Sequence, residues 1–278
     1  MSGSTDASKP TLADTGFEPE SDAAIGDDHA RRLAACLDID TRILDAGELP
    51  MLWHWACFLP LVTAAELGPD GHSRRRPEMD AFHQRMWVGG RVRGERALQL
   101  GLNAERISRL ARAEPKEGST GRFWLLTVAH TISQAGAVCV EEEQDLVLRK
   151  ASAVAMPGDD RDDPPGDEWV EERHADPVLL FRFSASTANA HRIHYDHPYA
   201  TNVEGYPDLV VHGPLTALLL ADFARRHHGE AIHEIAFRAH MPHFANRRFW
   251  LAGHPTDDGI ETAAVRADHA VAMTLTAR

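Results

Sequence analysis

Cysteine is scarce in this chain, with three among 278 residues, and the three lie far apart without forming a C-x-x-C pair: Cys36, Cys57 and Cys139. This pattern excludes a disulfide framework and a cysteine-based zinc site. It is typical of a reducing cytoplasm, where we expect the protein to be located. Long apolar runs are missing as well, so we expect no transmembrane helix. The first residues do not combine a basic start with an apolar stretch, so we expect no secretory signal.

Basic side chains are in deficit. Lysine and arginine total 29 against 42 aspartates and glutamates, which gives a formal net charge of −13 at pH 7. Nucleic-acid-binding proteins normally present a basic face, so we expect neither a nucleic-acid nor a membrane partner. Part of the negative charge is local. Residues 1–29 are polar, acidic and poor in aromatics, and we predict that they form a disordered tail.

A second acidic stretch marks a boundary between two halves. Residues 156–175 are rich in aspartate, glutamate, proline and glycine, so we predict an acidic, solvated linker rather than a helix or strand. The linker separates residues 30–155 from residues 176–278. Each of these parts is long enough to bury a core of its own, so we predict two domains.

Periodicity predicts the elements of each half. In the first half it indicates a short helix at 30–39, an apolar helix at 48–67 that Pro60 interrupts, a strand at 86–92, and a hairpin of strands at 121–133 and 135–150. In the second half it indicates strands at 177–186, 233–240, 247–254 and 262–277, and a helix at 213–229. Each half therefore combines an apolar helix with antiparallel strands, so the predicted class is α+β, with two copies of one plan.

Histidines are concentrated in the loop before the last predicted helix. "RIHYDHPYAT" at 192–201 is followed by "VVHGPL" at 210–215, directly before that helix. Helix N-termini stabilise negative charge, and Gly213, which has no side chain, lets a substrate oxygen approach its N–H closely. An imidazole from the loop facing the same point would suit proton transfer next to a carbonyl whose enolate must be stabilised. A metal site is the other chemistry that these residues indicate.

The extended motif "SASTANAHRIHYDHPYATNVEGYPDLVVHGPL" resembles the hydratase motif of the MaoC-like enoyl-thioester hydratases. The similarity is strongest to the branch that contains hydroxyacyl-thioester dehydratase type 2 and the mesaconyl-C4-CoA and itaconyl-CoA hydratases. "LPMLWHWACFLP", "LGPDGHSRR" and "RMWVGGRV" resemble the first domain of that branch. The resemblance implies a double hot-dog fold, in which each half is a long helix wrapped by an antiparallel sheet. It also implies that the first half supplies the substrate groove and residues 176–278 carry the catalysis.

The same resemblance assigns site residues. The family histidine falls on His194, and the glycine whose N–H binds the thioester oxygen falls on Gly213. The family aspartate is replaced by Asn189, an amide that takes up no proton but orients water. We therefore expect His194 to transfer the proton and Asn189 to position the water. Four further residues are expected to support the site, with Asp196 as a candidate second carboxylate and His212 as a residue that holds the loop by a backbone hydrogen bond: Asp196, His212, Arg192 and Tyr195.

The implied reaction is the reversible addition of water to an α,β-unsaturated acyl-CoA, without a metal or other cofactor. A mesaconyl-C4-CoA or itaconyl-CoA type of substrate would require a cation in the pocket, for which four arginines are available: Arg85, Arg91, Arg192 and Arg238. The alternatives are a 3-hydroxyacyl-ACP dehydratase of fatty-acid synthesis, a non-catalytic acyl-thioester binding module, and an Fe(II) oxygenase. The last would use His194 and Asp196 with a third ligand from among His240, His243 and His254. A homodimer is the assembly to be tested.

Overall fold

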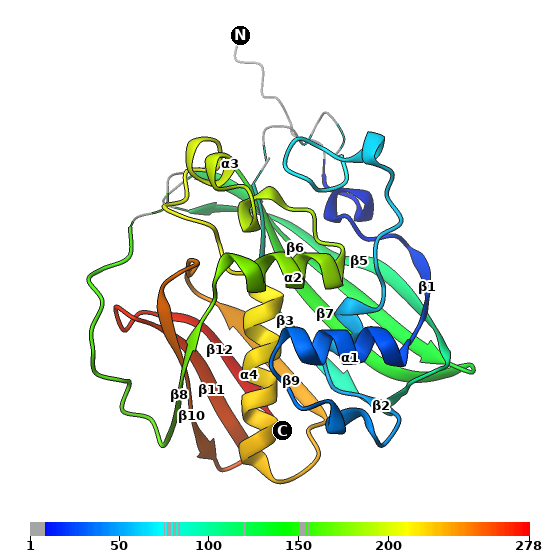
Figure 1. Ribbon diagram of the computed structural model, residues 1–278. Coiled ribbons are helices and arrows are strands. Elements are labelled where there is room, and N and C mark those ends of the chain that lie inside the picture. Colours follow the sequence, from blue (N-terminus) through cyan, green and yellow to red (C-terminus); the bar gives the residue numbers. More distant parts are fainter. Residues whose placement is uncertain are drawn as a thin grey trace.

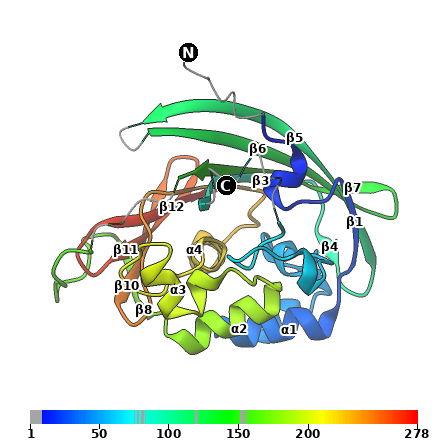
Figure 2. The same ribbon diagram turned by 90° about the horizontal axis from the view of Figure 1, so that it is seen from above.

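The computed structural model describes residues 9–74, 76, 79, 82, 84–118, 121–150, 154 and 156–278. Its main feature is an antiparallel sheet of ten strands in the order β1-β5-β6-β7-β3-β9-β12-β11-β10-β8. Figures 1 and 2 show this sheet as a curved layer around the long helix α4 (Gly213–His228), with the shorter helices on the same side.

The first half of the chain supplies five neighbouring strands. In sheet order they are β1 (Glu20–Ala24), β5 (Asn103–Gly118), β6 (Gly121–Gln134), β7 (Ala137–Arg149) and β3 (Gln84–Gly94). The predicted hairpin is confirmed, because β6 and β7 pair across a turn at Ala135 and Gly136, both with positive φ. The strand predicted at 86–92 is confirmed within β3, whereas β5 has no counterpart among the predicted elements.

The second half supplies the other five strands. From the far edge inward they are β8 (Trp169–His174), β10 (Arg248–Thr256), β11 (Gly259–Arg266), β12 (Val271–Ala277) and β9 (Glu234–Ala239). Both halves follow the same strand order in this ten-stranded sheet. When the five strands of a half are numbered along the chain, their order across the sheet is first, third, fourth, fifth and second. The halves join where β3 pairs with β9, with Gly89 opposite Arg238. The predicted duplication is therefore confirmed for the strands, and the predicted strand at 262–277 is two strands.

The remaining elements are short. The helices are α1 (Asp27–Cys36), α2 (Pro177–Thr187) and α3 (His197–Asn202), and a small sheet pairs β2 (Glu48–Leu49) with β4 (Leu98–Gln99). The 3-10 turns are η1 (Leu12–Thr15), η2 (Thr41–Leu44), η3 (Trp53–Ala56), η4 (Ala64–Glu66) and η6 (Arg192–His194). In the part of the chain that the structure describes, no helix is long and apolar enough to cross a membrane.

Helix α4 forms as predicted. Pro214 lies in its first turn, where a missing N–H costs nothing, and Gly229 ends it in the left-handed conformation with φ of 78°. Its apolar side chains at helical spacing are all buried: Leu215, Leu218, Leu219 and Phe223. The helix packs on β10, β11 and β12, so its N-terminus is fixed against the middle of the sheet.

Among its described residues, the first half has no counterpart of α4, and the helix predicted at 48–67 is wrong. This segment forms the short turns η3 and η4 with extended chain between them. Pro50 and Pro60 break the helical hydrogen-bond pattern, and Leu52 has a positive φ of 71°. The side chains of His54 and Trp55 instead hydrogen-bond to the buried carboxylate of Glu142 on β7, at 3.0 and 2.6 Å.

The strand predicted at 177–186 is also wrong, since these residues form α2. The Asp176 side chain caps the helix by accepting a hydrogen bond from the Leu179 N–H at 2.7 Å, and Pro177 occupies the first position. Leu180, Phe183 and Ser184 are buried at helical spacing. By periodicity alone, a short apolar run fits a helix and a strand equally well. In this segment the N-terminal cap at Asp176 favours the helix.

The predicted disordered tail is wrong for residues 9–29, and its first eight positions lie outside the described residues. Strand β1 pairs with β5 at the sheet edge, and the Asp14 carboxylate is buried against the guanidinium of Arg76, at 2.6 Å. Ala23 and Ile25 are buried in the main core. The few apolar residues of this acidic segment are thus placed where the sheet edge covers them, which composition alone does not reveal.

Ile25 provides a test of this packing. Ile25→Ala should lower the free energy of unfolding by about 2–5 kcal/mol, the usual cost of emptying a core position. Glu20→Ala, on the exposed side of the same segment, should change it by less than about 0.5 kcal/mol. Chemical denaturation of the two variants checks the expectation, and equal unfolding midpoints would show that the segment does not pack on the sheet.

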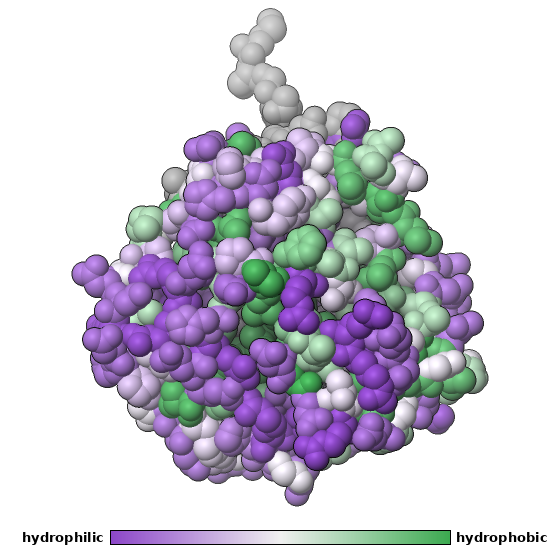
Figure 3. All heavy atoms as spheres, viewed as in Figure 1, coloured by the Kyte–Doolittle hydropathy of each residue, from purple (hydrophilic) through white to green (hydrophobic). Residues whose placement is uncertain are grey.

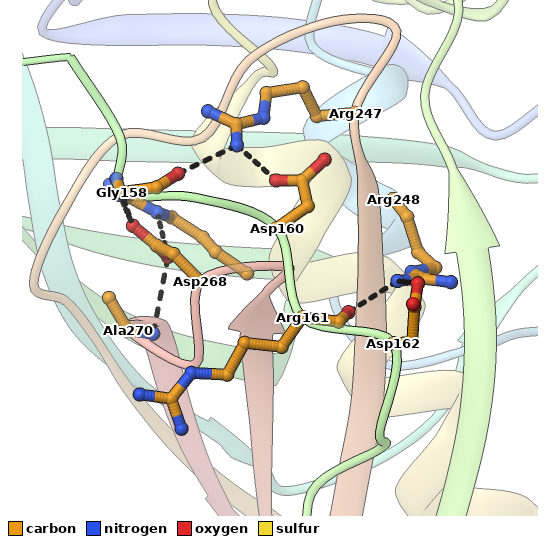
Figure 4. Close-up of polar contacts among 9 residues, drawn as sticks. Gly158, Asp160, Arg161, Asp162, Arg247, Arg248, Asp268 and Ala270 are labelled. Carbon is orange, nitrogen blue, oxygen red and sulfur yellow. Dashed lines mark hydrogen bonds and ion pairs between the residues drawn. The ribbon is translucent and has the colours of Figure 1, made fainter.

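The acidic linker is only partly as predicted. Residues 156–168 have no regular structure, but residues 169–174 form β8 and pair with β10. Figure 4 shows the irregular part attached to the second half, where the Gly158 N–H donates to the Asp268 carboxylate at 2.8 Å and the Arg247 side chain pairs with Asp160. The negative charge of this segment is thus partly neutralised by basic residues near the start of β10.

Candidate active site

His194 lies at the centre of the site. It ends the turn η6, is 6% exposed, and lines a cavity of about 1360 Å³. Its Nδ1 atom is 2.7 Å from the carbonyl oxygen of Val210. A carbonyl oxygen only accepts hydrogen bonds, so Nδ1 carries the ring hydrogen and Nε2 is left with a lone pair. The ring is therefore held in the tautomer that acts as a base at Nε2.

The protonation state of His194 fits this role. Burial lowers the pKa of His194 to about 4, and the hydrogen bond to Val210 offsets part of that effect. The imidazole is therefore neutral at pH 7, and its base form is lost only as the pH falls through about 4. In this neutral form the lone pair at Nε2 can accept a proton.

His212 lies directly behind His194. The two rings stack with their centroids 3.6 Å apart, and His212 Nε2 is 2.8 Å from the hydroxyl oxygen of Ser184 on α2. The expected backbone hydrogen bond from the His212 ring is not what holds the loop, because its other nitrogen, Nδ1, has no partner among the described residues. Ring stacking and the Ser184 hydroxyl hold it instead.

Gly213 begins α4 next to the same cavity. The N–H groups of a helix's first turn have no acceptor within the helix, and the helix dipole makes this end favourable for negative charge. A Cβ atom at this position would lie 2.7 Å from Cε3 of Trp87, so only glycine fits here. Trp87 is itself fixed by stacking on Phe237 and by donating to the side chain of Gln144 at 3.1 Å.

Asn189 also lines the cavity, five residues before His194. Its carbonyl oxygen Oδ1 accepts a hydrogen bond from the backbone N–H of His191 at 3.0 Å, which shapes the loop. Its amide NH₂ group is the part of the side chain with which it can orient a water molecule.

None of the four expected supporting residues lines the cavity, and three of them form contacts within the loop. Asp196 caps α3 by accepting from the Tyr199 N–H and pairs with Arg192 at 2.7 Å. The hydrogen bond from Arg192 holds the pKa of Asp196 below its usual value. The hydroxyl of Tyr195 donates to the carbonyl of Ala190 at 3.0 Å. These contacts make Asp196, Arg192 and Tyr195 residues that hold the loop, and they leave Asp196 no place as a second base.

The residues of the alternative iron site, His194 and Asp196 with a third histidine, are not arranged around a common point. Asp196 is bound to Arg192, and Nδ1 of His194 is bound to Val210. The three candidate third ligands each have another partner: His240 contacts Thr274, His243 contacts Thr216, and His254 contacts Asp167. Another histidine–carboxylate cluster lies beside the cavity, where one nitrogen or oxygen atom each from Asp70, His72 and His191 lies within 4.8 Å of the others.

Asp70, His72 and His191 were not identified as candidate site residues from the sequence. His72 and His191 line the cavity, and their ring centroids are 4.1 Å apart. The ring of His191 is in turn 5.5 Å from that of His194. Asp70 and His72 lie in the "LGPDGHSRR" stretch, which resembles the family's first domain. Nothing in that stretch indicates that it contacts the loop around His194.

Both halves of the chain line the cavity. Trp55 and Phe58, from the segment that was predicted to be helical, line it together with Gly213 and His194. On the face shown in Figure 3, apolar side chains gather at the upper right, where Figure 1 places the segment around residues 59–67. Leu59, Leu61 and Val62 of that segment line the cavity, and Leu61 is 89% exposed. The space is therefore large, mostly apolar and open to solvent.

Solved structures with this architecture define the class. HtdX from Mycobacterium tuberculosis superposes with a TM-score of 0.69 at 16% identity, covering 94% of this chain and 99% of that one. A MaoC-like dehydratase from Phytophthora capsici superposes with a TM-score of 0.68 at 12% identity, covering 97% and 98%. At these identities the likeness shows the fold, and the predicted double hot-dog fold of the MaoC-like proteins is confirmed.

Sequence comparison then gives the family. Residues 52–245 match the family model of hydroxyacyl-thioester dehydratase type 2. A mesaconyl-C(4)-CoA hydratase from Chloroflexus aurantiacus is 42% identical over 231 residues, covering 82% of each chain. The chain belongs to the hydroxyacyl-thioester dehydratase type 2 family, and the predicted enzyme class, a hydro-lyase acting on acyl thioesters, is confirmed.

Proposed function

We propose that the substrate is a short, branched α,β-unsaturated acyl-CoA that carries a second, free carboxylate, as mesaconyl-C4-CoA does, and that the enzyme adds water across its double bond reversibly. The observation that carries this proposal is the 42% identity to a mesaconyl-C4-CoA hydratase over most of both chains. The site is consistent with it, because a base and a helix N-terminus line the same cavity.

The residues of the site divide the reaction between them. The thioester oxygen accepts a hydrogen bond from the Gly213 N–H, so charge that develops on that oxygen is stabilised by the N-terminus of α4. Nε2 of His194 takes a proton from water as the water oxygen bonds to the β-carbon. The amide group of Asn189 orients that water. The CoA of the substrate is the only cofactor-like group that these steps use.

A free carboxylate on the substrate needs a cation, and position selects one of the four candidate arginines. Arg85 on β3 lines the cavity, two residues before Trp87 and therefore on the same face of the strand. Burial lowers the pKa of His191 well below its usual value, and positive charge on neighbouring side chains, Arg85 among them, acts in the same direction. Nη1 of Arg85 also donates to the Thr15 carbonyl at 2.6 Å, which positions the side chain.

The other three arginines do not line the cavity. Arg91 pairs with Glu143 on the exposed side of the sheet, Arg192 pairs with Asp196, and Arg238 is exposed on β9. We therefore assign the carboxylate of the acyl group to Arg85. The net charge of −13 disfavours docking of an acidic acyl-carrier protein, so CoA is the proposed carrier.

Substrate selectivity tests this assignment. Arg85→Met should lower kcat/KM for mesaconyl-C4-CoA by about 10- to 100-fold, the usual loss for a charged hydrogen bond. It should change kcat/KM for crotonyl-CoA, which lacks the carboxylate, by less than about threefold. Arg91→Met, on the same strand but outside the cavity, is the matched control and should change neither value. Steady-state kinetics by enoyl-thioester absorbance measures all three proteins.

Two results would contradict the proposal. Equal losses on both substrates for Arg85→Met would mean that Arg85 supports the fold and does not recognise a carboxylate. A wild-type enzyme that prefers crotonyl-CoA or a long-chain 3-hydroxyacyl-ACP over mesaconyl-C4-CoA would show that the acyl group is of another kind.

A further inference from the structure

The catalytic loop has lost the carboxylate that its family motif provides, since Asn189 stands in that position. An amide neither takes up nor delivers a proton at neutral pH. Hydration requires two proton movements, one from the attacking water and one to the α-carbon. His194 accounts for the first, and the second needs another group on the cavity wall.

Two carboxylates line the cavity among the described residues, and both lie away from the catalytic loop in the chain. Glu66 caps its own 3-10 turn by accepting hydrogen bonds from Thr63 at 2.7 and 2.9 Å. Glu18 lies just before the N-terminal strand β1. Asp70, also from the first half of the chain, meets the catalytic loop through its backbone, and one of its carboxylate oxygens lies within 4.8 Å of a ring nitrogen of His191.

The loop around Asp70 is joined to the catalytic loop by its backbone. The Arg192 N–H donates to the carbonyl of Asp70 at 2.9 Å, and the Arg192 side chain donates to the carbonyl of Pro69 at 2.9 Å. A Cβ atom on Gly71, which has φ of 89°, would lie 1.8 Å from the carbonyl oxygen of Ala190. Only glycine permits this approach, so the two loops form one unit although more than a hundred residues separate them.

Within that unit, a carboxylate and an imidazole form a pair. Asp70 is 7% exposed, and its Oδ2 lies 3.3 Å from Nδ1 of His72, while its Oδ1 accepts from the His72 backbone N–H at 3.0 Å. With Nδ1 on the side of Asp70, Nε2 is the nitrogen on the opposite side of the His72 ring. A buried carboxylate behind an imidazole fixes its tautomer and stabilises its protonated form, as in hydrolase triads.

We propose that His72, held by Asp70, is a second proton-transfer group of this site and takes the place of the aspartate that Asn189 replaces. This inference rests on the proposed hydratase function. His72 would be a catalytic residue, and Asp70 a positioning residue that acts through it. The site is then built from both halves of the chain, with His194 from the second and His72 from the first.

In the hydration direction the two imidazoles divide the proton movements. Nε2 of His194 takes a proton from water as the water oxygen bonds to the β-carbon, and the π electrons move onto the thioester as an enolate held by the Gly213 N–H. The α-carbon then takes a proton from Nε2 of the His72 imidazolium, and the enolate collapses to the thioester. The proton on His194 returns to His72 through water in the cavity, along the wall formed by the ring of His191 between them.

The experiment uses the full chain, the enoyl-CoA that the wild type hydrates fastest, and four variants. His72→Gln and Asp70→Asn should each lower kcat by about 10²-fold with KM changed by less than about threefold, because proton transfer is lost and binding is kept. Asn189→Asp, added to Asp70→Asn, should recover at least about tenfold in kcat by restoring a carboxylate at the family position. Asp167→Asn, which removes the histidine–carboxylate contact with His254 outside the cavity, should leave kcat unchanged.

Each alternative predicts something else. If Asp70 only supports the fold, Asp70→Asn lowers the unfolding temperature and the loss of kcat is not rescued by Asn189→Asp. If Asp70, His72 and His191 hold a metal ion, the purified protein carries one per chain and chelation abolishes turnover. Each of these two outcomes would overturn the inference, and so would an unchanged kcat in His72→Gln. None of the three would contradict the proposed hydratase function. A wild type that hydrates no enoyl-CoA at all would overturn both.

Discussion

His194→Asn should lower kcat by about 10²–10⁴-fold while the protein unfolds at nearly the same temperature. Asparagine can still donate a hydrogen bond to the Val210 carbonyl, which His194 does through Nδ1 at 2.7 Å, so the loop keeps its anchor. What the variant lacks is the lone pair at Nε2 that takes the proton from water. Single-turnover and steady-state kinetics on one enoyl-CoA, with thermal unfolding as a check on the fold, measure the effect.

Asp196→Asn is the control for this prediction, because Asp196 lies two residues away in the same loop. It caps α3 and pairs with Arg192, and it does not line the cavity. Its loss should therefore lower stability more than kcat, with a change in kcat of less than about tenfold. Abolished turnover in Asp196→Asn together with a tolerated His194→Asn would mean that the base has been assigned to the wrong residue.

Gly213→Ala should lower kcat by about 10²–10³-fold, the usual cost of losing one oxyanion-hole donor. A Cβ atom here would be 2.7 Å from the Trp87 ring, which is stacked on Phe237, so either the ring or the N-terminus of α4 has to move. Movement of the helix displaces the N–H that meets the thioester oxygen. KM should change less than kcat, because charge develops on that oxygen mainly in the transition state.

The matched control is Gly229→Ala at the other end of the same helix. Gly229 has φ of 78°, and a Cβ atom added to it would have no neighbouring atom within 4 Å, so alanine there strains the backbone without touching the cavity. It should lower the free energy of unfolding by about 1 kcal/mol and leave kcat unchanged. Full activity in Gly213→Ala would show that the N-terminus of α4 does not bind the thioester oxygen.

Local signals explain what could be predicted from the sequence. The β6–β7 hairpin and α4 are long, strongly periodic, and bounded by Gly136 or by Pro214 and Gly229, so pattern and caps agree. The segment 177–187 is short and apolar, and its helical state depends on the Asp176 cap. The segment 48–67 looks helical by its apolar content, but its tryptophan and histidine side chains satisfy Glu142, a partner far along the chain.

The residues of the candidate site also fall into two groups, those that local sequence patterns predict and those that they do not. His194, Asn189 and Gly213 were predicted from one continuous motif, and all three line the same cavity. Asp70 and His72 could not be predicted from the sequence, because their contact with the catalytic loop depends on how the two halves of the chain pack together. No local sequence pattern encodes that packing. Residues from both halves line the cavity, so its shape depends on the same packing.

The central claim is that this chain adds water to an enoyl-CoA bearing a free carboxylate. The most direct measurement incubates the wild type with mesaconyl-C4-CoA in ¹⁸O-labelled water and follows both the enoyl-thioester absorbance and the mass of the thioester. We expect the absorbance to fall to an equilibrium value, one labelled oxygen to enter the product, and both changes to disappear in His194→Asn. A thioester that binds but keeps its mass and absorbance would contradict the account and leave a binding module in place of the enzyme.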